Sequence, residues 1–504
     1  MIFKNFTLNQ FKILTINFYF CLSLFLIIIS FKYVQDWSVQ IYYLVYLLLT
    51  SILLKEKKFN NNNLSLLLNF YTTFFLTIPL SYIVLNPSYI FGSGNLLLPF
   101  KQIEYRQSLD IVILKIIFFW VSIWLSIFLT AKKNYEKEFV SKNQIIYINI
   151  NILFLIAIIG LIISVLTNYN FIDSLQNNKT PEKSFLRFLF SDHAIIIYSS
   201  ILFIYYKNLN KNMKFNNLEL KYFIFVFIYF LNFLFLGSKG GILILYLLSF
   251  LFILSSFKNS KKINIFFLRS NTIILLIFTT LITYIIIDIF RADYYYLSKT
   301  ISFSDLTQIF QKVFFDIYYS SIKGLEKILI RLTNQGMDQF ILINLTFSEY
   351  DFEYAKQFSL YIYKNFINLM LPGTIYLEAY SPSSQLFTEI LFKSNLNGAI
   401  EELELLKKLN TQPFTAFGFF TILFGSYLSL IMSFIYFLFL SLLINKTHDV
   451  FFRVIVVCLF YLSFVTFSFE EVVASQIQLY FQILFIHFFA LTLNQLFRKN
   501  TYFN

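Results

Sequence analysis

The chain has 504 residues, of which 58% are hydrophobic, 21% aromatic and 13% charged, and its formal net charge is +13. An average soluble protein carries about 25% charged residues, so this composition excludes a water-soluble globule and predicts a membrane protein. The two cysteines, Cys21 and Cys458, both lie in apolar runs, which excludes a disulfide framework and a cysteine-based metal site.

Twelve apolar segments are long enough to span a membrane, because a helix of about 20 residues crosses a hydrocarbon layer of about 30 Å. We predict spans at residues 13–30, 38–54, 64–85, 109–130, 145–166, 188–206, 220–236, 242–257, 271–290, 414–444, 451–468 and 474–494. No small-x-small cleavage site follows the first segment, so we interpret it as a span and not as a signal peptide. The tenth is long enough to begin as a half-buried or tilted helix before Gly425.

The basic residues orient these spans. With the N-terminus inside, about one residue in four is Lys or Arg in the inner loops, and about one in nine in the short outer loops. Every short loop fits this single alternating arrangement, so both termini are predicted to be cytoplasmic. The positive charge thereby belongs to loops that face anionic lipid, and it does not indicate a nucleic-acid partner.

A long segment, residues 291–413, separates the ninth and tenth spans on the outer side. It is rich in Phe, Tyr, Leu and Ile, a composition that disfavours disorder. Residues 321–333 and 354–371 place apolar side chains three and four apart, which predicts amphipathic helices on the outer membrane face or capping the bundle. The chain is therefore predicted to be an all-α polytopic integral membrane protein, with nine spans in residues 1–290, this large loop, and three spans in residues 414–504.

Charged residues are rare within the predicted spans, and the clearest exceptions, Lys115 and Asp288, lie near outer ends. Ion-coupled transporters place ionisable groups near the midplane, so that class is disfavoured and we expect function at the outer face. No nucleotide-binding loop, dinucleotide fingerprint, zinc motif or nucleophile elbow is present, and no metal or cofactor is expected.

A tight outer turn, residues 237–241, reads Gly-Ser-Lys-Gly-Gly. Its glycines permit a sharp turn, and the amide groups of Gly240 and Gly241 would open the next helix beside Lys239. That arrangement suits an anion such as phosphate. A plain hairpin turn between two helices is the alternative that spacing alone favours.

Two further sets of side chains belong to the predicted outer face. The cations, which would hold a lipid diphosphate as hydrogen-bond donors or simply reach lipid headgroups, are Arg106, Arg187, Arg291, Lys299, Lys323 and Arg331. The carboxylates, any of which is a candidate general base or a solvated or paired side chain, are Asp293, Asp338, Glu349, Glu378, Glu389, Glu470 and Glu471. The three histidines, His193, His448 and His487, are expected to be structural.

The layout resembles the Wzy-type O-antigen or capsular repeat-unit polymerases: twelve spans, cytoplasmic termini and one large outer loop late in the chain. Short motifs carry the same resemblance: Ser238-Lys239-Gly240, with Lys where the family commonly has Arg; Ile330-Arg331-Leu332 followed by Asp338; Leu371-Pro372-Gly373; Ser383-Ser384-Gln385; and Pro413 leading into Gly418.

The resemblance implies a metal-independent glycosyltransferase of the GT-C kind in the bacterial cytoplasmic membrane. Its substrates would be oligosaccharides on polyprenyl diphosphate, and chain-length regulator and flippase proteins would be partners. The residues it implies are Arg291, Arg331, Lys239, Gly240, Gly241 and Arg106 for the diphosphate, and Asp338 or Glu378 for the acceptor hydroxyl.

Three other functions remain open. An O-antigen ligase shares the layout, but its large loop carries a characteristic His, and residues 291–413 contain none. A flippase or exporter of the same lipid-linked sugars would be expected to show internal repeats and a charged cavity. A non-catalytic scaffold or receptor would use the large loop for docking.

Overall fold

The computed structural model describes residues 41–49, 77–85, 109–130, 148–176, 185–209, 216–235, 416–447, 449–465 and 469–500, with single residues at 245 and 311 and several between 352 and 363. For some of these residues only the backbone is described. The helices with defined bounds are α5 (Ile78–Leu85), α7 (Leu109–Thr130), α8 (Ile150–Gln176), α9 (Phe185–Leu189), α10 (Asp192–Leu209), α11 (Asn216–Phe235), α19 (Ala416–Lys446), α20 (Val450–Val465) and α21 (Phe469–Asn500). The described part is thus helical, as predicted.

Within this described part, three helices are long and apolar enough to cross a membrane: Ile111–Thr130 in α7, Tyr427–Ile444 in α19 and Val472–Phe497 in α21. Shorter apolar helices occupy Ile150–Ser164, Asp192–Phe203, Leu220–Phe233 and Phe451–Phe460. These helices support the prediction of a membrane protein. The full set of twelve spans stays a prediction.

The bounds predicted for the span at 109–130 are those of helix α7. The other predicted bounds differ more from the ends of the helices. Helix α8 continues to Gln176, ten residues past the predicted end of its span at 166, and α10 begins at Asp192 after the short α9. The spans predicted at 13–30 and 271–290 lie outside the described residues.

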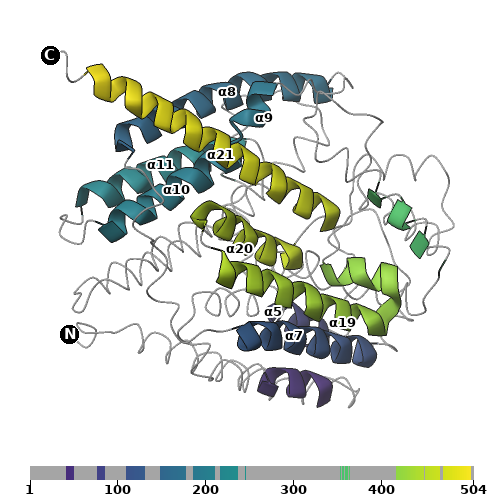
Figure 1. Cartoon of the computed structure of the whole chain (residues 1–504). Coiled ribbons are helices and arrows are strands. Elements are labelled where there is room, and N and C mark those ends of the chain that lie inside the picture. The colour runs from purple at the N-terminus through teal and green to yellow at the C-terminus, as the bar shows by residue number, and fades with distance from the viewer. Residues whose placement is uncertain are drawn as a thin grey trace.

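The described helices form two groups joined by α21 (Figure 1). In the first, the α10 group, α10 packs against α8 and α11. In the second, the α19 group, α19 packs against α7 and α20. Helix α21 runs diagonally between them and contacts α8, α9 and α10 on one side and α20 on the other.

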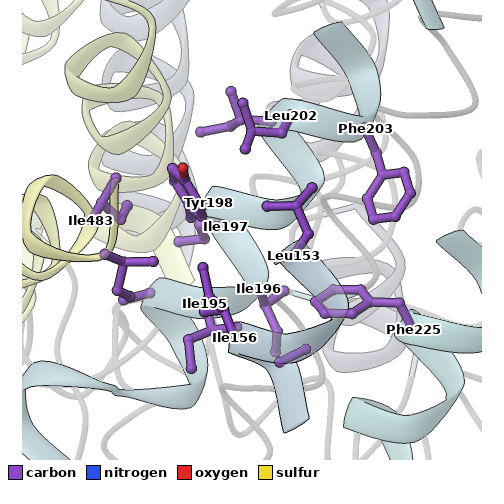
Figure 2. Close-up of a cluster of buried hydrophobic side chains, with 14 of the residues drawn as sticks. Leu153, Ile156, Ile195, Ile196, Ile197, Tyr198, Leu202, Phe203, Phe225 and Ile483 are labelled. Carbon is purple, nitrogen blue, oxygen red and sulfur yellow. The ribbon is translucent and has the colours of Figure 1, made fainter. Parts of the chain in front are cut away.

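The core of the α10 group is a cluster of buried aliphatic and aromatic side chains (Figure 2). Ile195 and Tyr198 of α10 and Ile483 of α21 belong to this cluster, and all three are fully buried. Gly160 of α8 makes this packing possible, because a Cβ added there would overlap the Cδ1 atom of Ile195. Small residues of this kind allow close helix approach in membranes, where packing rather than water exclusion drives association.

Helix α19 is broken at Gly425, whose φ of 74° and ψ of 172° are accessible only to glycine. The rings of Phe420 and Tyr436 lie with centroids 5.8 Å apart, whereas a continuous helix would separate them by about 24 Å at 1.5 Å per residue. Residues 416–424 therefore fold back against the rest of α19, as the sharp bend in Figure 1 shows. The half-buried or tilted start predicted before Gly425 is instead a reversal of direction.

Part of the large loop packs onto this fold-back. The described residues between 352 and 363 are helical, with Ala355 and Phe358 buried and Lys356 and Ser359 exposed. The ring of Phe358 lies 6.1 Å from that of Phe419. A helix is present where we predict an amphipathic one, but its exposed side chains also include Phe352, Leu360 and Tyr363. Its buried Phe358 provides the contact with residues 416–424. The helix predicted at 321–333 lies outside the described residues.

Candidate functional site

The diphosphate and acceptor residues predicted from the sequence all lie outside the described residues. They are Arg106, Lys239, Gly240, Gly241, Arg291, Arg331, Asp338 and Glu378. Their roles stay predictions. Of the other charged positions, Asp288 also lies outside, Lys115 lies partly buried on α7, and the backbone places Glu470 and Glu471 in the first turn of α21.

A polar cluster joins three helices of the α10 group. The Ser164 hydroxyl of α8 donates a hydrogen bond to Oδ2 of Asp192 on α10 at 2.8 Å. The Asn232 side-chain amide of α11 donates to Oγ of Ser164 at 3.3 Å. We refer to Ser164, Asp192 and Asn232 as the Asp192 cluster. It contains a carboxylate, a hydroxyl and an amide, each from a different helix.

Aromatic side chains surround this cluster. The Tyr229 hydroxyl is buried and donates to the carbonyl oxygen of Ala157 at 3.2 Å. The His193 ring packs against Phe233 with centroids 5.2 Å apart, which agrees with the structural role expected for this histidine. The carboxylate therefore lies partly buried in an apolar and aromatic surrounding.

Local sequence explains why Asp192 stands here. The Ser191 hydroxyl accepts a hydrogen bond from the backbone N–H of Ala194 at 3.3 Å, so Ser191 caps α10. Asp192 then falls in the first turn, where the positive end of the helix dipole favours a carboxylate. The Ser191 hydroxyl also donates to Oε1 of Gln482 at 2.6 Å, which ties this end of α10 to α21.

The Asp192 cluster lies at the helix ends that are predicted to face outside, as the predicted diphosphate site does. The ends of α8, α10 and α11 that carry Ser164, Asp192 and Asn232 are those the basic-residue pattern places outside. Asn232 lies five residues before the Gly-Ser-Lys-Gly-Gly turn that begins at Gly237. Asp192 is the first residue of α10, so its carboxylate lies at this end of the bundle.

A second polar network lies where α20 meets α21. Asp449 caps α20 by accepting from the backbone N–H of Phe451 at 2.9 Å, and it accepts a hydrogen bond from the Tyr480 hydroxyl at 2.7 Å. Nearby, the Tyr198 hydroxyl lies 3.1 Å from Nδ1 of His487. These contacts fix a helix start and a helix junction, which is the structural role expected for His487.

Sequence reasoning did not identify the Asp192 cluster. Its members are 28 and 40 residues apart along the chain, so no local motif links them. The sequence offers one signal for this cluster, which is the acidic residue Asp192 within the predicted span 188–206. Among the described residues, no group of three or more His, Cys, Asp or Glu side chains is placed to hold a metal ion.

No protein-family model matches the chain, and no curated protein or solved structure matches it.

Proposed function

We propose that this chain is a membrane glycosyltransferase that polymerises polyprenyl-diphosphate-linked oligosaccharide repeat units into O-antigen or capsular polysaccharide. It would act at the outer face of the bacterial cytoplasmic membrane, with twelve spans in a GT-C-like arrangement. The observations that support this proposal best are the apolar helices long enough to cross a membrane and the packing of Phe358 from the large loop on Phe419 of α19.

The proposed reaction has two requirements. As the bond from the anomeric carbon to the diphosphate breaks, the leaving group takes the electron pair, and fixed cations stabilise its charge. Lys239, Arg291 and Arg331 are proposed for that role, with Arg106, Gly240 and Gly241 as further diphosphate contacts. The acceptor hydroxyl forms the new glycosidic bond and gives up its proton to a base, for which Asp338 or Glu378 is proposed.

The fold-back of α19 supports a large loop that stays close to the bundle. Phe358 of the loop contacts Phe419, and the neighbouring Phe420 contacts Tyr436 of the long part of α19. The loop is thus tied by aromatic contacts to a predicted membrane span. A loop held in this way is suited to cover a lipid-linked substrate.

Purified full-length protein supplied with a synthetic polyprenyl-diphosphate-linked repeat unit tests the proposal. The wild type is expected to give a ladder of polymers. Arg331→Ala is expected to insert and fold but to leave single-repeat product, because it removes a cation from the leaving group. Lys356→Ala, which removes an exposed loop cation outside the proposed site, serves as the control and should give the wild-type ladder.

Polymer of wild-type length from Arg331→Ala would contradict the assignment. Transfer of glycan to lipid A core in place of a ladder would identify a ligase. Movement of the lipid-linked sugar across vesicles without covalent change would identify a flippase.

A further inference from the structure

We propose that the helical residues described between 352 and 363, which we call the loop helix, lie in the headgroup region of the membrane. The exposed side chains of Phe352, Leu360 and Tyr363 then contact lipid. This inference goes beyond the proposed glycosyltransferase function and does not depend on it. It gives the large loop a second attachment, to the bilayer, in addition to its contact with α19.

The exposed residues of the loop helix lie on one face. They are Phe352, Lys356, Ser359, Leu360 and Tyr363. Their spacing of i, i+4, i+7, i+8 and i+11 is that of a single stripe along a helix. Phe352, Leu360 and Tyr363 are 62%, 56% and 68% exposed, so most of this stripe is formed by large apolar side chains.

A different face of the loop helix packs on protein. Ala355 and Phe358 are buried, and the Phe358 ring lies 6.1 Å from that of Phe419. The helix therefore carries apolar side chains on two faces, and its contact with residues 416–424 accounts for only one of them. Exposed apolar surface of this kind marks contact with a partner protein or a membrane.

The position of the loop helix favours the membrane. It lies beside the end of α19 at which the chain folds back (Figure 1), and the membrane span Tyr427–Ile444 follows directly after that break. The exposed side chains described in this span are all large and apolar, as expected for a face that meets lipid: Tyr427, Leu428, Ile431, Ile435, Phe439 and Leu442. The loop helix is therefore attached where a lipid-facing helix reaches the membrane boundary.

The chemistry of the stripe also favours lipid headgroups over a second protein surface. Tyr363 combines an apolar ring with a polar tip, which is typical of residues at the membrane–water interface. Lys356 lies within the stripe, where its ammonium group can reach lipid phosphates, whereas lysine is depleted from the buried parts of protein interfaces. The Ser359 hydroxyl donates to the carbonyl oxygen of Lys356 at 2.9 Å, so it keeps a hydrogen bond when it leaves water.

Nitroxide accessibility tests the proposal. Phe352→Cys and Tyr363→Cys are made separately in full-length protein that lacks Cys21 and Cys458, spin-labelled, and placed in nanodiscs of phosphatidylcholine and phosphatidylglycerol. Oxygen concentrates in the bilayer, whereas a water-soluble nickel complex stays outside it. At both positions, collisions with oxygen should exceed collisions with the nickel complex.

Helix α19 provides the two reference positions. Ile435 is exposed near the middle of its span, so the label in Ile435→Cys should show the strongest excess of oxygen collisions. Lys446 is exposed at the end of the same helix, beyond the span, so the label in Lys446→Cys should collide more often with the nickel complex.

The proposal requires an excess of oxygen collisions at both loop positions. An excess of nickel collisions at either position would show that the stripe faces water and would overturn the inference. Protection from both reagents would show that protein covers the stripe, from this chain or a second copy, and would overturn it equally. If either variant does not fold, Leu360→Cys takes its place. Lipid contact in a protein that makes no polymer would end the polymerase proposal and leave this inference standing.

Discussion

The two helix groups on either side of α21 differ in the polar side chains that join their helices. In the α19 group, the described polar contacts between helices join neutral hydroxyls, such as Thr130 with Ser441 and Tyr436 with Ser463. In the α10 group, Ser164 donates to a carboxylate, Asp192, and Asn232 donates to Ser164.

The two kinds of polar contact differ in what they cost to bury. Neutral hydroxyl pairs satisfy one another and hold helices together at little cost. A carboxylate in the same environment costs more to bury. The α19 group instead departs from regular structure in its backbone, at the Gly425 break to which the large loop attaches. The described loop residues attach to the α19 group through Phe358 and Phe419.

The largest expected effects test whether the two groups are separate packing units. Phe203 contacts Phe154, Tyr222 and Phe225, and Phe437 contacts Phe119, Tyr436 and Phe460. Both rings are almost fully buried, so Phe203→Ala and Phe437→Ala should each lower the free energy of unfolding by about 3 kcal/mol. Because their contacts share no residue, the double variant should show the sum within about 0.5 kcal/mol.

Denaturation of the protein in detergent micelles gives these values. A double variant that loses clearly less or more than the sum would mean that the groups pack as one unit.

A medium effect is expected where α8 meets α10. Gly160→Ala places a Cβ against Ile195, and the resulting overpacking should cost about 2 kcal/mol. Ile158→Ala on the exposed side of the same helix is the control and should change stability by less than about 0.5 kcal/mol. Equal stability of Gly160→Ala and wild type would contradict the overpacking and mean that the Ile195 side chain moves aside at no net cost.

The backbone break of the α19 group gives an effect of similar size. Gly425→Ala forces an L side chain to φ 74° and ψ 172°, a region that only glycine adopts readily, and should cost about 2 kcal/mol. The same denaturation measurement applies, with the exposed Leu428→Ala as the control. A stabilised Gly425→Ala variant would mean that α19 is continuous and does not fold back.

The smallest effect sharpens the contrast between the two kinds of polar contact. A double-mutant cycle on Thr130 and Ser441 should give a coupling of about 0.6 kcal/mol, as for other hydrogen bonds between helices in membranes. The same cycle on Ser164 and Asp192 should give about 1.5 kcal/mol or more, because the acceptor is charged. Equal couplings would remove the distinction between the groups.

The sequence predicts helices well where an apolar run ends sharply. Residues 109–130 were predicted as a span and form α7, because Gln107 and Ser108 precede the run and charged residues follow Thr130 closely. The span predicted at 188–206 begins four residues before α10, which begins at Asp192. A window of average hydropathy does not detect the Ser191 cap inside it. Average hydropathy also ends the predicted span at residue 166, because polar residues follow. Helix α8 continues through those residues to Gln176.

The tertiary features lay beyond sequence reasoning. Gly425 indicated an irregularity, but a glycine in an apolar run permits a tilt, a kink or a reversal, and only packing of Phe420 on Tyr436 selects the reversal. The Asp192 cluster depends on three residues far apart in the chain, so it becomes visible only when the helices are assembled. Of the predicted outer cations, Arg187 has a described backbone in α9, and the others and the loop carboxylates lie outside the described residues. Their arrangement stays a prediction.

The central claim is that the end of the α10 group carrying the Asp192 cluster faces the outside of the cell. Single cysteines placed at Leu186 on α9 and at Leu496 on α21, each 56% exposed, test it in a variant that lacks Cys21 and Cys458. A membrane-impermeant maleimide should label Leu186→Cys in intact cells and Leu496→Cys only after permeabilisation. Labelling of Leu496→Cys in intact cells, with Leu186→Cys reached only from the cytosol, would contradict the claim.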